Sequence, residues 1–290
     1  MASHAAIQVP ERHEANSFVN VSYSSWKSAV LNDATTTNDT TFVNTLPTGS
    51  SFSLYMNHTS NNGNSATPYV DNTGSNTTQV QMTTANARAL GFSPSGTDAT
   101  ITFSSLFSWD FDNRDGIDSG KQDFVGVAIH EIMHSMGFVS NVDDVDFSSN
   151  LTDDSYRAAG LDFTRFSINS LAAGANIDFT ADTRAKFFSI DGGATNLTPG
   201  ASGGWSTGVN FGDGRQASHW KDGLGWGIMD PTAQPAGNLN VVTNLDLMAL
   251  DVIGWNRITA VPEPSAMLLF VVSLLGLSCF RRNSVPMCLA

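Results

Sequence analysis

Cysteine is scarce in this 290-residue sequence, which holds only Cys279 and Cys288, both within the last dozen residues. The chain before them therefore has no disulfide and no thiolate metal ligand, and a cysteine-based latency switch is excluded. Basic residues are also few, with 14 Lys and Arg against 27 Asp and Glu. Because phosphate binding requires a cationic face, this acidic balance argues against a nucleic-acid partner.

Hydrophobic residues make up 41% of the sequence, which is enough for one large domain with a sizeable core. Residues 1–17 are polar, and we expect a disordered N-terminus there. We expect one folded domain over residues 18–257, in which short strands and helices mix as in the α+β class. The predicted elements are helices at 24–33, 83–92 and 243–255, strands at 51–58, 77–82 and 98–105, a loop at 59–77 and a hairpin about Asp191–Gly193.

The stretch DFVGVAIHEIMHSMGF, residues 123–138, is the centre of the sequence. Its apolar residues recur with helical periodicity and cover most of the circumference, so we expect a buried helix that ends at Gly137. Burying His130, Glu131 and His134 together is costly unless something binds them. The two histidines are four residues apart and leave the same helix face. This is the spacing of a zinc site, with Glu131 placed as a general base.

One further histidine lies downstream of this pair. His219 follows a glycine-rich run and precedes the sequence Gly-Ile-Met-Asp-Pro at 227–231. A third metal ligand is one interpretation of His219, and a surface histidine beside Trp220 is the alternative. Asp143 and Asp144 are rival candidates for the third ligand, because carboxylates also bind zinc.

The pattern HExxHxxGF, a later histidine and a following methionine together resemble the metzincin clan of zinc endopeptidases. Ser140 stands where the short form of the pattern has its third ligand, so the sequence is more similar to the leishmanolysin-type arrangement, in which an insertion precedes the third histidine. The resemblance covers about residues 98–255. Pro231 stands where many metzincins have a tyrosine, so no tyrosine helper is implied. The resemblance implies the zinc ligands His130, His134 and His219, the general base Glu131 and a hydrophobic floor at Met229.

The same resemblance implies a mixed twisted sheet over the active-site helix, and a lower subdomain with the C-terminal helix. It implies Zn²⁺ with one position open for a water, whose proton Glu131 takes and passes to the leaving amine of a peptide bond. By analogy with the family, the strand at 98–105 pairs with an extended protein or peptide substrate.

The segment at 110–118 is rich in aspartate and precedes the central helix. A calcium loop is one interpretation, but Arg114 stands where the EF-hand pattern requires an oxygen ligand, so that match fails. The other interpretation is a solvated turn with Ser119 as the N-cap of the helix.

The C-terminal part of the sequence has a linker with a Pro-Glu-Pro motif at 258–264, an apolar segment ending in two arginines at 265–282 and a tail at 283–290. This order of parts resembles the sorting tag of Gram-negative exoproteins that an exosortase processes. A plain C-terminal anchor is the alternative, although the apolar stretch is short for a stable span of about 20 residues. Both interpretations place the domain outside the cytoplasm, with transient membrane insertion of the C-terminal segment before processing.

These patterns together predict a secreted or cell-surface zinc metalloendopeptidase of a Gram-negative bacterium. The first alternative is a non-catalytic surface or matrix protein with a structural metal site. The second is an adhesin, suggested by the Asn- and Thr-rich loops, in which the histidines are incidental. An open metal position beside Glu131 favours the enzyme, whereas a closed four-ligand site favours the matrix protein.

Overall fold

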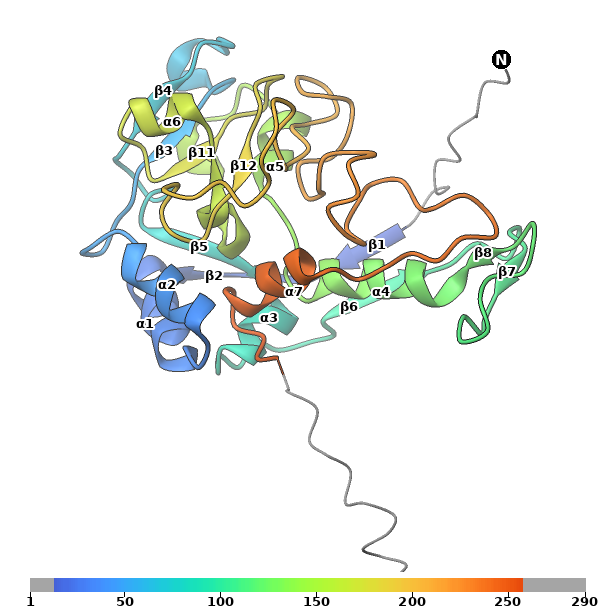
Figure 1. Ribbon diagram of the computed structural model, residues 1–290. Coiled ribbons are helices and arrows are strands. Elements are labelled where there is room, and N and C mark those ends of the chain that lie inside the picture. Colours follow the sequence, from blue (N-terminus) through green and yellow to red (C-terminus); the bar gives the residue numbers. More distant parts are fainter. Residues whose placement is uncertain (1–12, 258–290) are drawn as a thin grey trace, which may run out of the picture. The chain divides into compact units, whose positions relative to one another are not determined.

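The computed structural model describes residues 13–257, and the described residues before Arg257 belong to one compact unit (Figure 1). Its α-helices are α1 Tyr23–Asp33, α2 Thr37–Thr45, α3 Thr84–Ala89, α4 Phe124–Ser135, α5 Val142–Phe147, α6 Ile168–Ala172 and α7 Asn244–Asp251. Its strands are β1 His13–Asn16, β2 Phe18–Ser22, β3 Leu54–Met56, β4 Tyr69–Asp71, β5 Gln79–Thr83, β6 Ala99–Thr102, β7 Trp109–Asp110, β8 Gln122–Asp123, β9 Ala158–Ala159, β10 Arg165–Phe166, β11 Ile177–Phe179 and β12 Phe187–Phe188.

These helices do not include one with both the length and the hydrophobicity that crossing a membrane requires. That statement covers residues 13–257 only. The linker, apolar segment and tail predicted at 258–290 lie outside the described residues.

The described strands form five small sheets. β5 lies between β2, to which it is antiparallel with Val19 opposite Met82, and the parallel strand β9. β3 lies between the parallel strand β11 and the antiparallel strand β4. The other strands pair two by two, β1 with β6, β7 with β8 and β10 with β12. The α+β class is therefore confirmed, but the single twisted sheet is not observed, because the described strands form five separate sheets of two or three strands each.

The first described residues form a strand. Residues 13–16 run antiparallel to β6, with His13 opposite Thr102 and Asn16 opposite Ala99. The Ser17 N–H then donates to the carbonyl oxygen of Asp98 at 2.9 Å. The prediction of disorder over 1–17 is therefore wrong for residues 13–17, while residues 1–12 lie outside the described part. Main-chain hydrogen bonds form this ladder, so side-chain polarity did not indicate the strand.

Two other predictions of local structure are wrong. The stretch 59–77, predicted as a loop, contains β4, which pairs with β3. The hairpin predicted about Asp191–Gly193 is absent, because β12 pairs with β10, more than 20 residues earlier. There the Ser189 hydroxyl donates to the Asp191 carboxylate at 2.7 Å and stabilises a turn. Neither long-range pairing has a local turn signal that a sequence pattern would reveal.

Stacked aromatic side chains form two groups within the core. Trp26 stacks on Phe163 with ring centroids 4.6 Å apart, and both are buried. Trp205 stacks on Trp220 at 4.2 Å, and the edge of Phe138 meets Trp220 at 5.2 Å. The second cluster matters for the site, since Phe138 follows α4 closely and Trp220 is adjacent to His219.

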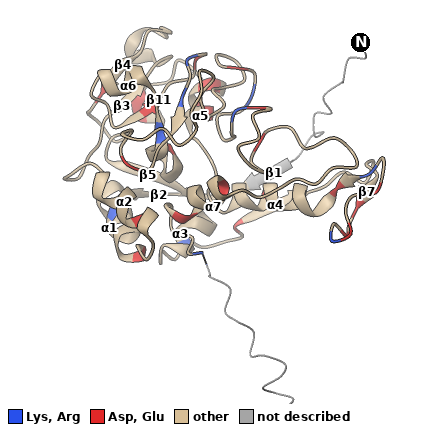
Figure 2. Cartoon of the chain, viewed as in Figure 1, with Lys and Arg blue, Asp and Glu red and all other residues tan. Residues whose placement is uncertain are grey.

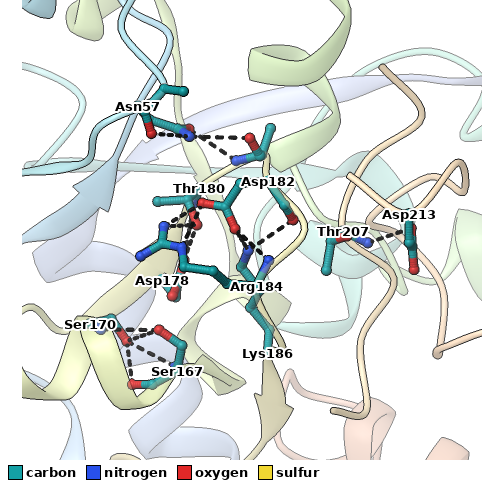
Figure 3. Close-up of polar contacts among 12 residues, drawn as sticks. Asn57, Ser167, Ser170, Asp178, Thr180, Asp182, Arg184, Lys186, Thr207 and Asp213 are labelled. Carbon is teal, nitrogen blue, oxygen red and sulfur yellow. Dashed lines mark hydrogen bonds and ion pairs between the residues drawn. The ribbon is translucent and has the colours of Figure 1, made fainter. Parts of the chain in front are cut away.

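A buried ionic cluster lies where the chain leaves β11 (Figure 3). Asp182 forms ion pairs with Arg184 and with Lys186, whose side chain is fully buried. Burial alone would raise the pKa of the Asp182 carboxyl, but the two cations outweigh burial and hold this pKa well below its usual range. The cluster therefore contributes stability only while Asp182 is ionised.

Candidate metal centre

Helix α4 begins at a buried aspartate. The Asp123 carboxylate accepts the N–H of Gly126 at 2.9 Å, as an N-cap does, and also the N–H of Asn240 at 3.0 Å. The same side chain thus caps the helix and holds a distant loop against it. The prediction of Ser119 as the N-cap is wrong, because residues 122–123 pair as β8 with β7 and delay the start of the helix.

The end of α4 is as predicted. Gly137 has a φ of +107°, and a Cβ at this position would lie 3.0 Å from the Cβ of Asn86. Only glycine fits both the conformation and the space. The turn that follows brings the carbonyl oxygen of Phe138 within 2.7 Å of Nδ1 of His134. The termination of the helix therefore orients one of its histidines.

The two histidines of α4 lie next to His219, which comes from a distant part of the sequence. His134 Nε2 lies 3.2 Å from Nε2 of His130 and 3.2 Å from Nε2 of His219. One nitrogen of each ring lies within 4.8 Å of the others, and all three residues are buried. Among the described residues this is the one group of three ligating side chains that could hold a metal ion.

Hydrogen bonds to carbonyl oxygens fix the orientation of the three rings. The Nδ1 atoms lie 2.7 Å from the Ile228 carbonyl for His130, 2.7 Å from the Phe138 carbonyl for His134 and 3.3 Å from the Gln216 carbonyl for His219. A carbonyl accepts only, so each Nδ1 carries its proton. In the neutral rings each Nε2 then presents a lone pair, and three lone pairs converge on one point. Doubly protonated rings would bury three cations together, which costs even more.

The geometry of the cluster fits a small divalent cation. Nitrogens held about 2.1 Å from a tetrahedral Zn²⁺ lie roughly 3.4 Å apart, close to the two separations of 3.2 Å observed here. The carbonyl partners at Nδ1 are the outer contacts that metal-ligating histidines make. The three imidazoles therefore fit the metal that the sequence predicted.

The rival ligands lie outside the histidine cluster. Asp144 is exposed. Ser140, at the position of the ligand in the short form of the pattern, donates its hydroxyl to the Asp162 carboxylate at 2.6 Å. Asp143 accepts hydrogen bonds from the main chain of Ala217 and Ser218. Burial raises the pKa of Asp143 to about 7, and these bonds oppose the rise. Neither Asp143 nor Asp144 belongs to the group that could hold a metal ion.

Met229 lies in a turn after His219 in the sequence and is fully buried. The Asp246 carboxylate accepts the indole N–H of Trp220 at 2.7 Å, the Ile228 N–H at 2.9 Å and the Met229 N–H at 3.3 Å. Asp246 also closes the capping box of α7 with Thr243, as predicted. One buried carboxylate therefore ties α7 to the methionine turn, and through the Ile228 carbonyl to His130.

Glu131 is 1% exposed and lies beside the histidines. It lines one small pocket with other residues of α4 and with residues of the methionine turn and the chain after it. The lining residues are Gly126, Val127, His130, Glu131, Ile228, Ala233 and Asn240. A carboxylate that shares a pocket with a candidate ligand is placed to exchange a proton with a molecule bound there.

The aspartate-rich segment at 110–118 lies beside β7 and carries charges of both signs (Figure 2). Three of its aspartates have partners within the segment or shortly after it. Asp110 accepts the N–H of Asp118 at 2.8 Å, Asp112 pairs with Arg114 at 2.6 Å, and Asp118 pairs with Lys121. The structure therefore favours the solvated turn over the calcium loop.

Two aspartates bind the chain around the three histidines, and the sequence did not indicate these contacts. Asp143 was considered only as a ligand, and Asp246 only as a helix cap. Their donors, which include Ala217 and Ser218 for Asp143 and Trp220 and Ile228 for Asp246, lie far away in the sequence, so no local pattern identifies them.

A family model of the PEP-CTERM protein-sorting motif matches residues 260–282. This motif implies processing by an exosortase and indicates a cell-surface protein of a Gram-negative bacterium. No curated protein and no solved structure matches the chain. The comparisons therefore bear on sorting, and the chemistry of the domain rests on its geometry.

Proposed function

We propose that this protein is an exported zinc-dependent endopeptidase, secreted or held at the cell surface. His130, His134 and His219 are the metal ligands and Glu131 is the general base. The observation that carries the proposal is the convergence of three buried Nε2 atoms whose rings already donate Nδ1–H to carbonyl oxygens. A cation between the rings would stabilise such an arrangement, because it would bind the nitrogens that the carbonyl contacts leave facing one another.

Zinc is the cation that this site favours. Imidazole nitrogens suit zinc, copper, iron and nickel, but zinc combines a tetrahedral preference with a ligand set of three histidines. When bound, zinc supplies a Lewis acid that polarises a carbonyl group and lowers the pKa of water in the fourth position.

Glu131 performs the proton transfer in this proposal. Its carboxylate takes the proton of the attacking water and delivers it to the nitrogen of the leaving amine, so no covalent intermediate with the protein is needed. The buried pocket that it shares with His130 keeps bulk solvent from competing for that proton. Met229 supports the ligands from below as an apolar side chain that makes no polar demand on the metal.

An extended polypeptide is the substrate class that fits the strand at 98–105. β6 contacts α4 and pairs with β1 on one edge. Within residues 13–257 its two-stranded sheet leaves the other edge without a partner strand. A substrate strand hydrogen-bonded to this edge would run beside the helix that carries the histidines.

The alternative is a non-catalytic surface protein in which the metal is structural. Structural zinc sites take four protein ligands, and the described residues bring three together here. The burial of all three histidines also argues against an adhesin in which they are incidental.

The test is metal content and proteolysis of the purified chain and of Glu131→Gln. We expect the wild type to hold one zinc per chain, to cleave an unstructured protein such as casein, and to lose activity to a chelator and regain it with zinc. Glu131→Gln should keep the zinc and lose about 10²–10⁴-fold in rate.

His58→Ala provides the control. His58 is a buried histidine outside the cluster, stacked on Phe211 at 3.9 Å, so its removal should leave zinc content and rate unchanged. Zinc binding without cleavage in the wild type would favour the structural alternative. Equal rates for the wild type and Glu131→Gln would remove Glu131 from the mechanism.

A further inference from the structure

We infer that Asp143 is a positioning residue that holds the loop of the third histidine in its metal-binding place. This inference rests on the proposed metal centre and adds a residue that no ligand pattern contains. Asp143 lies on α5, in the chain that directly follows the helix carrying His130 and His134.

Three donors converge on the Asp143 carboxylate. Its Oδ1 accepts the Ala217 N–H at 2.6 Å, and its Oδ2 accepts both the N–H and the hydroxyl of Ser218, at 3.2 and 2.6 Å. The Ser218 hydroxyl oxygen in turn accepts the N–H of Ser140 at 2.9 Å. The two residues that precede His219 are thereby bound to the segment that follows α4.

No regular structure holds His219 in place instead. The chain from Ser189 to Thr243, all of it described, has isolated β-bridges but neither a helix nor a strand. The Nδ1 contact of His219 is the longest of the three, at 3.3 Å against 2.7 Å for the others. Main-chain bonds hold the far side of this residue, where the Ser206 N–H donates to the His219 carbonyl at 3.0 Å. On the near side its position depends on Ala217 and Ser218, and these are the residues that Asp143 binds.

An asparagine at 143 would preserve volume and remove this function. Donors approach both carboxylate oxygens, so an amide placed in either orientation directs its NH₂ group at an N–H of Ala217 or Ser218. The loop then loses part of its anchor while the core keeps its packing.

Asp146 offers a matched control on the same helix. It is 2% exposed and accepts the N–H groups of Val209, Asn210 and Phe211 at 2.7–3.1 Å. It thus binds the same irregular segment through the same chemistry, but about ten residues away from His219. We expect asparagine at either position to lower the stability of the fold, but only asparagine at position 143 to lower the affinity for the metal.

The experiment measures zinc affinity by competition with a chelating dye for the folded wild type, Asp143→Asn and Asp146→Asn, with urea midpoints for each. We expect Asp143→Asn to bind zinc about 10–100-fold more weakly, as replacement of outer-shell partners does, and Asp146→Asn to bind within about threefold of the wild type. Should Asp143→Asn not fold, Ser218→Ala removes one of the three contacts and should weaken zinc binding to a smaller extent.

Two results overturn the inference while leaving the metal centre intact. One is a wild-type affinity in Asp143→Asn, or in Ser218→Ala if Asp143→Asn does not fold. The other is an equal loss of affinity in Asp143→Asn and Asp146→Asn, which would make the effect one of general stability. A wild type that binds no zinc at all would overturn the metal centre itself, and the inference with it.

Discussion

Replacing Asp246 with asparagine tests whether one buried carboxylate joins α7 to the methionine turn. Its Oδ1 accepts the Trp220 indole N–H and the Met229 N–H. Its Oδ2 accepts the N–H groups of Ile228 and Thr243 and the Thr243 hydroxyl. Every partner is a donor, so a side-chain NH₂ fits neither position.

The expected loss of stability follows from the oxygen that accepts fewer hydrogen bonds, which is Oδ1 of Asp246. An asparagine that keeps its oxygen toward Ile228 and Thr243 still loses the two bonds at Oδ1. Hydrogen bonds to a charged group contribute about 1.5–3 kcal/mol each, and a buried donor left without a partner costs about 1–3 kcal/mol. We expect the free energy of unfolding to fall by roughly 3–5 kcal/mol, a large share of the about 5–15 kcal/mol typical of a domain.

The assay is urea unfolding in the presence of a chelator, so that metal binding does not contribute to the stability. The control is Asp39→Asn, at the corresponding capping-box position of α2. There Oδ2 alone accepts the N–H groups of Thr35 and Thr36, so an asparagine keeps both bonds through its oxygen. We expect a loss of about 1 kcal/mol or less. Equal losses of stability in Asp246→Asn and Asp39→Asn would refute the argument that asparagine is harmful only where both carboxylate oxygens accept hydrogen bonds.

Two further variants test the helix end and the ionic cluster. Gly137→Ala should lower the free energy of unfolding by about 2–3 kcal/mol, because the new Cβ would lie 3.0 Å from Asn86 and the backbone has a positive φ. Gly91→Ala is the control, since it has a φ of +82° but open space around the Cβ, and it should cost about 1 kcal/mol. Thermal melts of both variants and the wild type measure the two losses. The folded pKa of Asp182 lies below its unfolded value of about 3.9, so its contribution is present above that pH and is lost as the pH falls. We therefore expect Asp182→Asn to be less stable than the wild type at pH 7, and its free energy of unfolding to fall less steeply as the pH is lowered. Parallel curves of stability against pH for the variant and the wild type would contradict the ion pairs with Arg184 and Lys186.

The sequence was sufficient where chemistry is local. The histidine pair lies on one turn of a helix, Gly137 requires a positive φ, and Thr243 with Asp246 forms the capping box, so each was predicted from residues within four positions of one another. The approach of His219 was predicted only through a family resemblance, because the spacing of 85 residues from His134 follows no helical or strand period. The structure then brought the three rings together.

The sequence was insufficient where partners are distant and the bonds are made by the main chain. β1 pairs with β6 through peptide groups, which every sequence carries, so the polar side chains at 13–16 suggested disorder. Asp143 was a credible ligand by residue type, but its donors are amides more than 70 positions away. The single twisted sheet was expected from the resemblance, and the described strands pair instead in five small sheets, which no local pattern indicated.

The irregular chain between Ser189 and Thr243 is held by contacts with distant residues. Its amides bind carboxylates such as Asp143, Asp146 and Asp246, which lie on short helices elsewhere. Because contacts between distant residues form late, we expect this segment to be the last part of the domain to order during folding and the first to loosen under stress. Any activity of the proposed metal centre would then arise only once His219 has reached its place.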